Sequence, residues 1–183
     1  MNRHLITVSM TALICLSGTA QAATNVAAGL PSSSYTDSQN WDGHTGETLF
    51  NGGSWNAGDS GIQWAQVDLL GTKLVTGISY ATDQLPDGLS WQRVYISDTP
   101  IGHDWSNLTP AVYFEGYTTA NTPIAFSFSG IAGRYVEIVA YNEGSWTALQ
   151  SAVITAVPEP ETYAMLLTGL GLMGYVARRR KSV

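Results

Sequence analysis

The central part of this chain of 183 residues is a succession of short apolar or alternating runs, each closed by turn residues. In a strand, successive side chains point to opposite faces, so short alternating runs bounded by Gly, Pro, Asn or Asp predict β-strands. Many such strands at close spacing favour an antiparallel β-sandwich or barrel. The runs are residues 63–69, 74–81, 90–97, 111–117, 123–128, 134–141 and 148–155.

Helical periodicity is missing from residues 23–156, so the crossover helices of a parallel α/β fold are not expected. The region has the size of one ordinary domain. It contains no cysteine, because Cys15 is the only one in the chain, and it must therefore be stabilised by its core and not by disulfides. We expect that core to contain the following residues: Trp55, Trp64, Val67, Leu69, Trp91, Tyr135 and Ile138.

Residues 1–22 have the order of a secretory signal peptide. Arg3 and His4 form a basic start, residues 5–16 are apolar, and Ala20 and Ala22 make an A-x-A cleavage site. The apolar run is shorter than the roughly 20 residues that a membrane-spanning helix needs. We therefore predict cleavage after Ala22, which also removes the cysteine.

Residues 157–183 have an equally specific order. A stiff Pro-Glu-Pro joint precedes an uncharged apolar stretch at 162–177, which predicts a transmembrane helix of roughly 24 Å at about 1.5 Å per residue. A basic tail at 178–181 should stay on the cytoplasmic side of the membrane. The residues that carry this order are Pro158, Glu159, Pro160, Arg178, Arg179, Arg180 and Lys181.

The three-part order resembles the PEP-CTERM sorting signal of exported bacterial proteins. The resemblance implies that an exosortase cuts near the Pro-Glu-Pro motif and releases the protein or re-attaches it at the surface. It also implies a Gram-negative bacterium that makes extracellular polysaccharide, with the protein transiently anchored in the inner membrane. An ordinary C-terminal membrane anchor is the alternative interpretation.

The region between the two ends is acidic. It keeps three basic residues, Lys73, Arg93 and Arg134, against twelve of the fourteen Asp and Glu, so its net charge is near −9. Nucleic-acid binding relies on Lys and Arg that displace counterions from phosphates. We therefore expect no nucleic-acid partner.

Several segments resemble the discoidin, or coagulation-factor C-type, domain. The resemblance spans about residues 25–155 and implies an all-β, galactose-binding-like jelly-roll sandwich, flanked here by the signal helix and the sorting helix. Such domains are commonly sugar- or surface-recognition modules. The segments are the turn at 49–53 with Trp55, the strand QWAQVDL at 63–69, the strand GRYVEIVA at 133–140 and the closing residues 144–149 with 153–154.

The same resemblance raises the question of calcium. Members of the family often hold a structural Ca²⁺ with an Asp near the turn and a Glu in the closing strand, but residues 51–52 read Asn-Gly and residues 149–150 read Leu-Gln. Ca²⁺ needs six to eight oxygen ligands. Asp42, Glu47 and Asp59 are the remaining candidates, so we expect no cofactor and keep a structural calcium as the weaker alternative.

Catalytic motifs are lacking: there is no G-x-S-x-G or H-E-x-x-H pattern and no cysteine nucleophile after cleavage. His103 and Asp104 are neighbours that could act on a nucleophile, but adjacent side chains often point apart. Acids cluster without a spacing that selects a glycosidase pair. We therefore predict no catalytic residue. The clustered acids are Asp37, Asp42, Glu47 and Asp59.

The predicted loops are better suited to sugar binding than to catalysis. Sugars offer apolar C–H faces and many hydroxyls, so their sites need exposed aromatic side chains beside amide or carboxylate groups, and these loops contain both. Trp41, His103, Trp105 and Asn142 are the candidate ligand-binding residues. Asp68 lies inside a strand and is expected to have a structural role. The favoured hypothesis is a non-enzymatic surface or matrix protein that binds extracellular polysaccharide. The alternatives are a structural or adhesion protein that binds another protein, and an envelope hydrolase.

Overall fold

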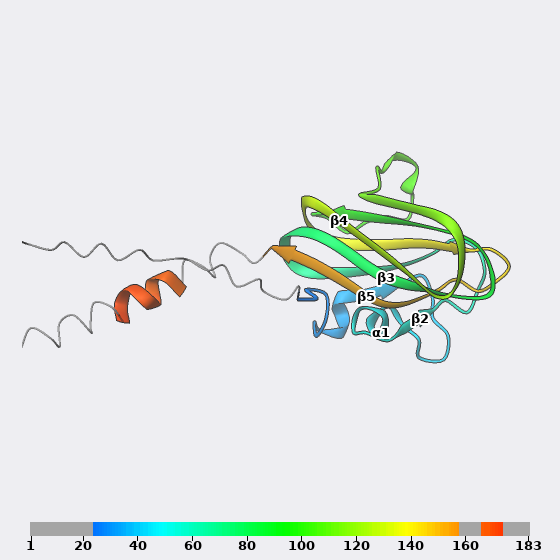
Figure 1. Cartoon of the computed structure of the whole chain (residues 1–183), viewed down its shortest axis with the longest axis horizontal. Coiled ribbons are helices and arrows are strands. Elements are labelled where there is room, and N and C mark those ends of the chain that lie inside the picture. Colours follow the sequence, from blue (N-terminus) through cyan, green and yellow to red (C-terminus); the bar gives the residue numbers. More distant parts are fainter. Residues whose placement is uncertain (1–23, 158–165, 174–183) are drawn as a thin grey trace, which may run out of the picture.

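The computed structural model describes residues 24–157 and 166–173. The first of these ranges is almost entirely β-structure with short helical turns (Figure 1). Its elements are, in order, η1 (Ser32–Ser34), β1 (Tyr35–Asp37), α1 (Gly46–Phe50), β2 (Ser54–Asn56), β3 (Gln63–Ser97), η2 (Trp105–Asn107), β4 (Val112–Asn142) and β5 (Ala148–Val157).

Two long, bent strands, β3 and β4, build most of the fold. The first arm of β3, at 63–68, and its last arm, at 90–97, pair antiparallel with the same arm of β4 at 135–142. The middle arm of β3 pairs with β5 on one side and with residues 120–127 of β4 on the other. These pairings produce one curled antiparallel sheet whose arms fold over one another (Figure 1).

The all-β prediction is confirmed, but the runs expected as separate strands are arms of longer elements. The strand pairing is interrupted at the bends, where single residues take left-handed backbone angles: Leu70 at φ 61° and Gly130 at φ 112°. Because glycine adopts this region without steric cost, Gly130 suits its bend.

The predicted flanking segments lie largely outside the described residues. This applies to the signal peptide at 1–22 and to most of the sorting segment, of which residues 166–173 are helical and exposed. Among the described residues, no helix is long and apolar enough to cross a membrane. The sorting and cleavage residues outside the described ranges are Ala20, Ala22, Pro158, Glu159, Pro160, Arg178, Arg179 and Arg180.

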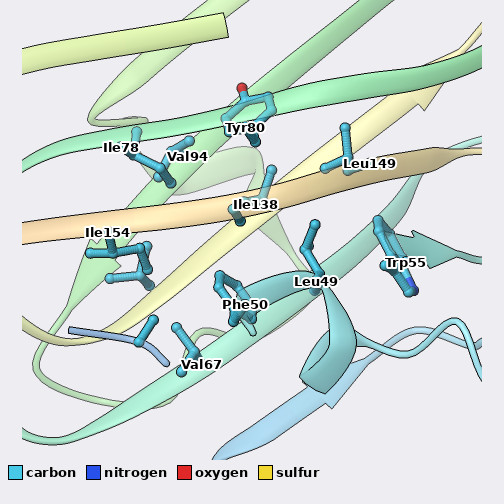
Figure 2. Close-up of a cluster of buried hydrophobic side chains, with 14 of the residues drawn as sticks. Leu49, Phe50, Trp55, Val67, Ile78, Tyr80, Val94, Ile138, Leu149 and Ile154 are labelled. Carbon is cyan, nitrogen blue, oxygen red and sulfur yellow. The ribbon is translucent and has the colours of Figure 1, made fainter. Parts of the chain in front are cut away.

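The main core lies between the folded-over arms of the sheet. The short helix α1 inserts Leu49 and Phe50, both fully buried, beside the fully buried Trp55 of β2 (Figure 2). Thr45 caps α1 because its side-chain oxygen accepts from the Thr48 amide at 3.2 Å. The helix therefore closes one side of the core.

The predicted core is partly wrong, for a reason of strand parity. Trp55, Val67, Leu69 and Ile138 are buried in the main core as expected. Trp64, Trp91 and Tyr135 are only partly buried and pack against a second cluster of Tyr95, Ile101 and Val139 on the outer face. Residues an odd number of positions apart on one strand face opposite sides, so Trp64 and Val67 cannot share a core.

Candidate functional site at the loop end

Three loops meet at the end of the domain where β5 begins, away from Val157 (Figure 1). The Thr147 amide donates to the Asp59 carbonyl at 2.9 Å, which ties loop 143–147 to loop 57–61. The Ser145 hydroxyl donates to the Leu85 carbonyl at 2.7 Å, which ties it to the unpaired stretch of β3 at 84–87 that follows the middle arm. These hydrogen bonds hold the loops around one hollow.

The hollow has a volume of about 730 Å³, within the usual range for small-molecule sites. Its lining mixes apolar surface with carboxylate, amide and hydroxyl groups. The lining residues are Asn56, Ser60, Asp83, Leu85, Gly144, Ser145 and Trp146.

Two exposed indoles stand together at this hollow. Trp146 lines it, and the Trp41 ring lies 5.7 Å from the Trp146 ring at an interplanar angle of 60°. The exposed fractions are 48% for Trp41 and 46% for Trp146. Large aromatic side chains usually gain stability from burial, so two exposed indoles beside a hollow indicate a binding surface.

Trp41 is held rigidly by its surroundings. Its amide donates to the Asn56 carbonyl at 2.9 Å, and its carbonyl accepts from the His44 amide at 2.9 Å. The turn between Trp41 and His44 uses two left-handed residues, Asp42 and Gly43, as tight hairpin turns do. A Cβ on Gly58 would lie 2.8 Å from the Trp41 Cβ, so only glycine allows this close approach. The backbone and Cβ of Trp41 are therefore held in place, and the indole projects from a fixed point.

The charge at this end is negative. Asp83 lines the hollow, and the neighbouring loop carries Asp59, which accepts from the Gln39 amide at 3.1 Å. Lys and Arg are missing from the lining. The hollow can stack a ring on an indole and hydrogen-bond its substituents, and its charge favours a neutral or positively charged ligand.

The structure divides the sequence-predicted ligand residues between two places. Trp41 and Asn142 lie at the loop end, but Asn142 is 1% exposed, and its side-chain amide donates to the Tyr141 carbonyl and accepts from the Ala148 amide, both at 3.2 Å. Asn142 therefore supports the loop that carries Trp146. The sequence does not single out Trp146, because it follows a Gly-Ser pair just as the fully buried Trp55 does.

His103 and Trp105 lie together elsewhere, over the outer face of the sheet. The Trp105 indole donates to the Glu137 carboxylate at 2.6 Å, and the Gln66 amide donates to its other oxygen at 2.9 Å. Glu137 is fully buried, and this burial raises its pKa to about 7, although the hydrogen bonds from Trp105 and Gln66 act in the opposite direction.

The adjacent His103 and Asp104 do not form a catalytic pair. Asp104 accepts from both the amide and the hydroxyl of Ser106, at 3.2 and 2.6 Å, and so caps η2. Asp68, expected to be structural, forms a two-pronged ion pair with Arg134 at 2.7 Å. Within the described ranges, no group of three or more His, Cys, Asp or Glu is placed to hold a metal ion.

A curled antiparallel β domain of this kind is the fold of solved carbohydrate-binding modules, although their sequences differ widely from this one. The chain belongs to the F5/8 type C domain family, whose pattern matches residues 30–153. Residues 156–181 match the PEP-CTERM protein-sorting motif. Both resemblances seen in the sequence are thus confirmed.

Solved structures share this fold at low sequence identity. Chitosan-binding module 1 from a chitosanase/glucanase of Paenibacillus sp. IK-5 is 17% identical, with a TM-score of 0.53, 73% of this chain covered and 99% of that one. The family 32 carbohydrate-binding module of C. perfringens NanJ, solved with galactose, is 13% identical, with a TM-score of 0.52 and coverages of 66% and 90%. A fucolectin from striped bass (Morone saxatilis) serum is 17% identical, with a TM-score of 0.57 and coverages of 74% and 50%.

No curated protein is similar enough in sequence to count as a match. The matched families account for a binding-module domain and a sorting motif, and neither is a catalytic domain. The sorting motif implies export, processing by an exosortase and sorting to the surface.

Proposed function

We propose that this protein is a non-enzymatic surface or matrix protein whose β domain binds extracellular polysaccharide through the loop-end hollow. The observation that carries the proposal is the pair of exposed, neighbouring indoles, Trp41 and Trp146, beside a hollow of about 730 Å³. Residues 1–22 serve as the signal peptide, 23–156 as the binding domain and 157–183 as the sorting segment. The protein is transiently anchored in the inner membrane of a Gram-negative bacterium before processing.

Both the apolar C–H groups and the hydroxyl groups of a sugar ring find suitable partners in this site. Its apolar C–H face packs on the indole of Trp41 or Trp146, and its hydroxyls reach the side chains of Asn56, Ser60 and Asp83. Relatives of the same fold support this choice, since their descriptions name chitosan, galactose and fucose as ligands. The acidic surroundings favour neutral or amino-sugar polymers over acidic ones.

The test is a glycan array and a polysaccharide pull-down with the full chain, kept in a detergent that has no sugar head group. Trp41→Ala and Trp146→Ala should each weaken binding about tenfold, because each removes an aromatic contact and its buried apolar area. Tyr117→Ala removes another exposed aromatic side chain that does not line the hollow and serves as the matched control. Binding that survives loss of both indoles, or no binding to any polymer, would overturn the proposal.

A second candidate function is adhesion to another protein. One observation favours it: the arm of β4 at 112–117 pairs only with β3 and exposes Tyr113 and Tyr117, the latter opposite the exposed Leu89. An arm at the edge of a sheet can accept a further strand. Loss of partner binding in Tyr117→Ala, with glycan binding unchanged, would favour this second candidate.

A further inference from the structure

A second hollow, of about 370 Å³, lies on the outer face of the sheet and shares no lining residue with the loop-end hollow. β1, η1, the first arm of β3, β4 and the segment after β3 all contribute to it. The lining residues that matter here are Ser34, Thr36, Trp64, Asp68, His103 and Tyr135.

The wall formed by residues 100–105 is fixed to the sheet. The Gln66 amide donates to the Ile101 carbonyl at 3.3 Å, and the Ile101 amide donates back to the Gln66 oxygen at 3.1 Å. The Trp105 indole donates a hydrogen bond to the buried Glu137 of β4. β4 pairs with the first arm of β3, which in turn pairs with β1. Paired hydrogen bonds of this kind make the hollow preformed, which lowers the entropic cost of binding.

An aromatic stack forms one side of the hollow. The His103 ring lies flat against Trp64, with centroids 3.9 Å apart and an interplanar angle of 18°. About half of the His103 side chain is exposed. Its Nε2 lies 3.8 Å from the Oε2 of the buried Glu137, so the ring offers a ligand a flat face and one polar edge.

An unsatisfied hydroxyl lies on the other side. Ser34 lines the hollow, is 4% exposed, and its hydroxyl has no hydrogen-bond partner among the described residues. A buried hydroxyl without a partner costs free energy that a ligand can recover by bonding to it.

The charges near the hollow largely cancel. The Asp68 carboxylate, which lines it, receives two hydrogen bonds of 2.7 Å from the Arg134 guanidinium. Neither charge is left to attract a strongly ionic ligand. A flat aromatic face, hydroxyl and imidazole partners and little net charge together suit an uncharged ring that carries hydroxyls.

We propose that this hollow, defined by the Trp64–His103 stack and Ser34, is a second site for a neutral sugar ring. The two hollows have no lining residue in common, so binding at one can be tested independently of the other. A domain with two separate glycan sites can bind two polymer chains at once or gain avidity on one chain. The protein would then cross-link the polymer as well as attach to it.

The experiment follows the six indole N–H signals of the full chain by NMR while methyl glycosides of glucose, galactose, mannose, fucose and N-acetylglucosamine are added. The signals are assigned with single Trp→Phe variants. At least one glycoside should shift the Trp64 signal saturably at millimolar concentration, and the shift should persist in the Trp41→Ala, Trp146→Ala double variant. A Trp64 signal that no glycoside moves, or that stops moving in the double variant, would overturn the proposal.

Three further variants separate binding from folding. His103→Phe keeps a ring on Trp64 but removes the nitrogens, and Ser34→Ala removes the unsatisfied hydroxyl; each should weaken binding at this site about fivefold without lowering the melting temperature. Ser60→Ala removes a hydroxyl from the loop-end hollow and should leave the Trp64 titration unchanged. Equal affinity in the first two variants and the native chain would show that these groups do not contact the ligand, and would refute the site.

Discussion

Replacing Glu137 by Gln tests how the buried carboxyl under Trp105 affects stability. Burial raises the pKa of Glu137 from 4.5 to about 7, and each pKa unit corresponds to about 1.4 kcal/mol. The folded chain therefore keeps a proton that the unfolded chain releases near pH 4.5. Stability from this group is fully present below pH 4.5, and about 3 kcal/mol of it is lost as the pH rises to 7.

The Gln side chain cannot ionise, but its carbonyl oxygen can still accept from the Trp105 indole. The assay is urea unfolding of both chains between pH 4.5 and 8, followed by tryptophan fluorescence. All six tryptophans lie between residues 41 and 146, so the signal reports the β domain. The free energy of unfolding of the native chain, minus that of Glu137→Gln, should fall by about 3 kcal/mol over this range and level off above pH 7.

Glu143→Gln makes the same chemical change on an exposed side chain. The unfolding free energy of the native chain minus that of Glu143→Gln should therefore not change over this pH range. A difference curve that stays flat for Glu137→Gln, or that rises with pH, would refute the reasoning. Either result would mean that the carboxyl ionises in the folded chain as readily as in the unfolded one.

Three other substitutions test the core, the site and the surface. Phe50→Ala should cost about 3–5 kcal/mol of unfolding free energy in urea titrations, because it empties a fully buried position; a cost under about 1 kcal/mol would contradict this packing. Gly58→Ala should weaken glycan binding on the array, since the new Cβ displaces Trp41 and φ is +70°; unchanged binding would argue against a fixed Trp41. The ion pair with Arg134 lowers the pKa of Asp68, so Asp68→Asn should be less stable at pH 7, and the gap should close as the pH falls below 3.8; a gap that persists at low pH would exclude the ion pair as its cause.

The sequence predicted the candidate site at the loop end only in part, because exposure depends on contacts between distant segments. Trp41 was selected as a loop aromatic, and it does lie exposed beside a hollow. Trp146 was missed, since nothing local distinguishes an exposed indole from the buried Trp55. The partners that fix the loops, such as Thr147 with Asp59, come from segments far apart in the chain.

Glu137 illustrates the same limit. In the sequence it is an ordinary acid in an alternating strand, on the opposite face from Val136 and Ile138. Only the segment that crosses the outer face, with His103 and Trp105, buries it and raises its pKa. A charge on an outer strand face is normally solvated, so local pattern could not predict this burial.

Sequence by itself determined the all-β class and the identity of the sorting motif, because both depend on local order: alternation of side chains in one case, and Pro-Glu-Pro, apolar and basic segments in the other. Tertiary structure decided which tryptophans are buried, which loops meet, and that Trp41 and His103 belong to different hollows. Those features depend on strand parity and on hydrogen bonds between residues remote in the chain, which no short window of sequence contains.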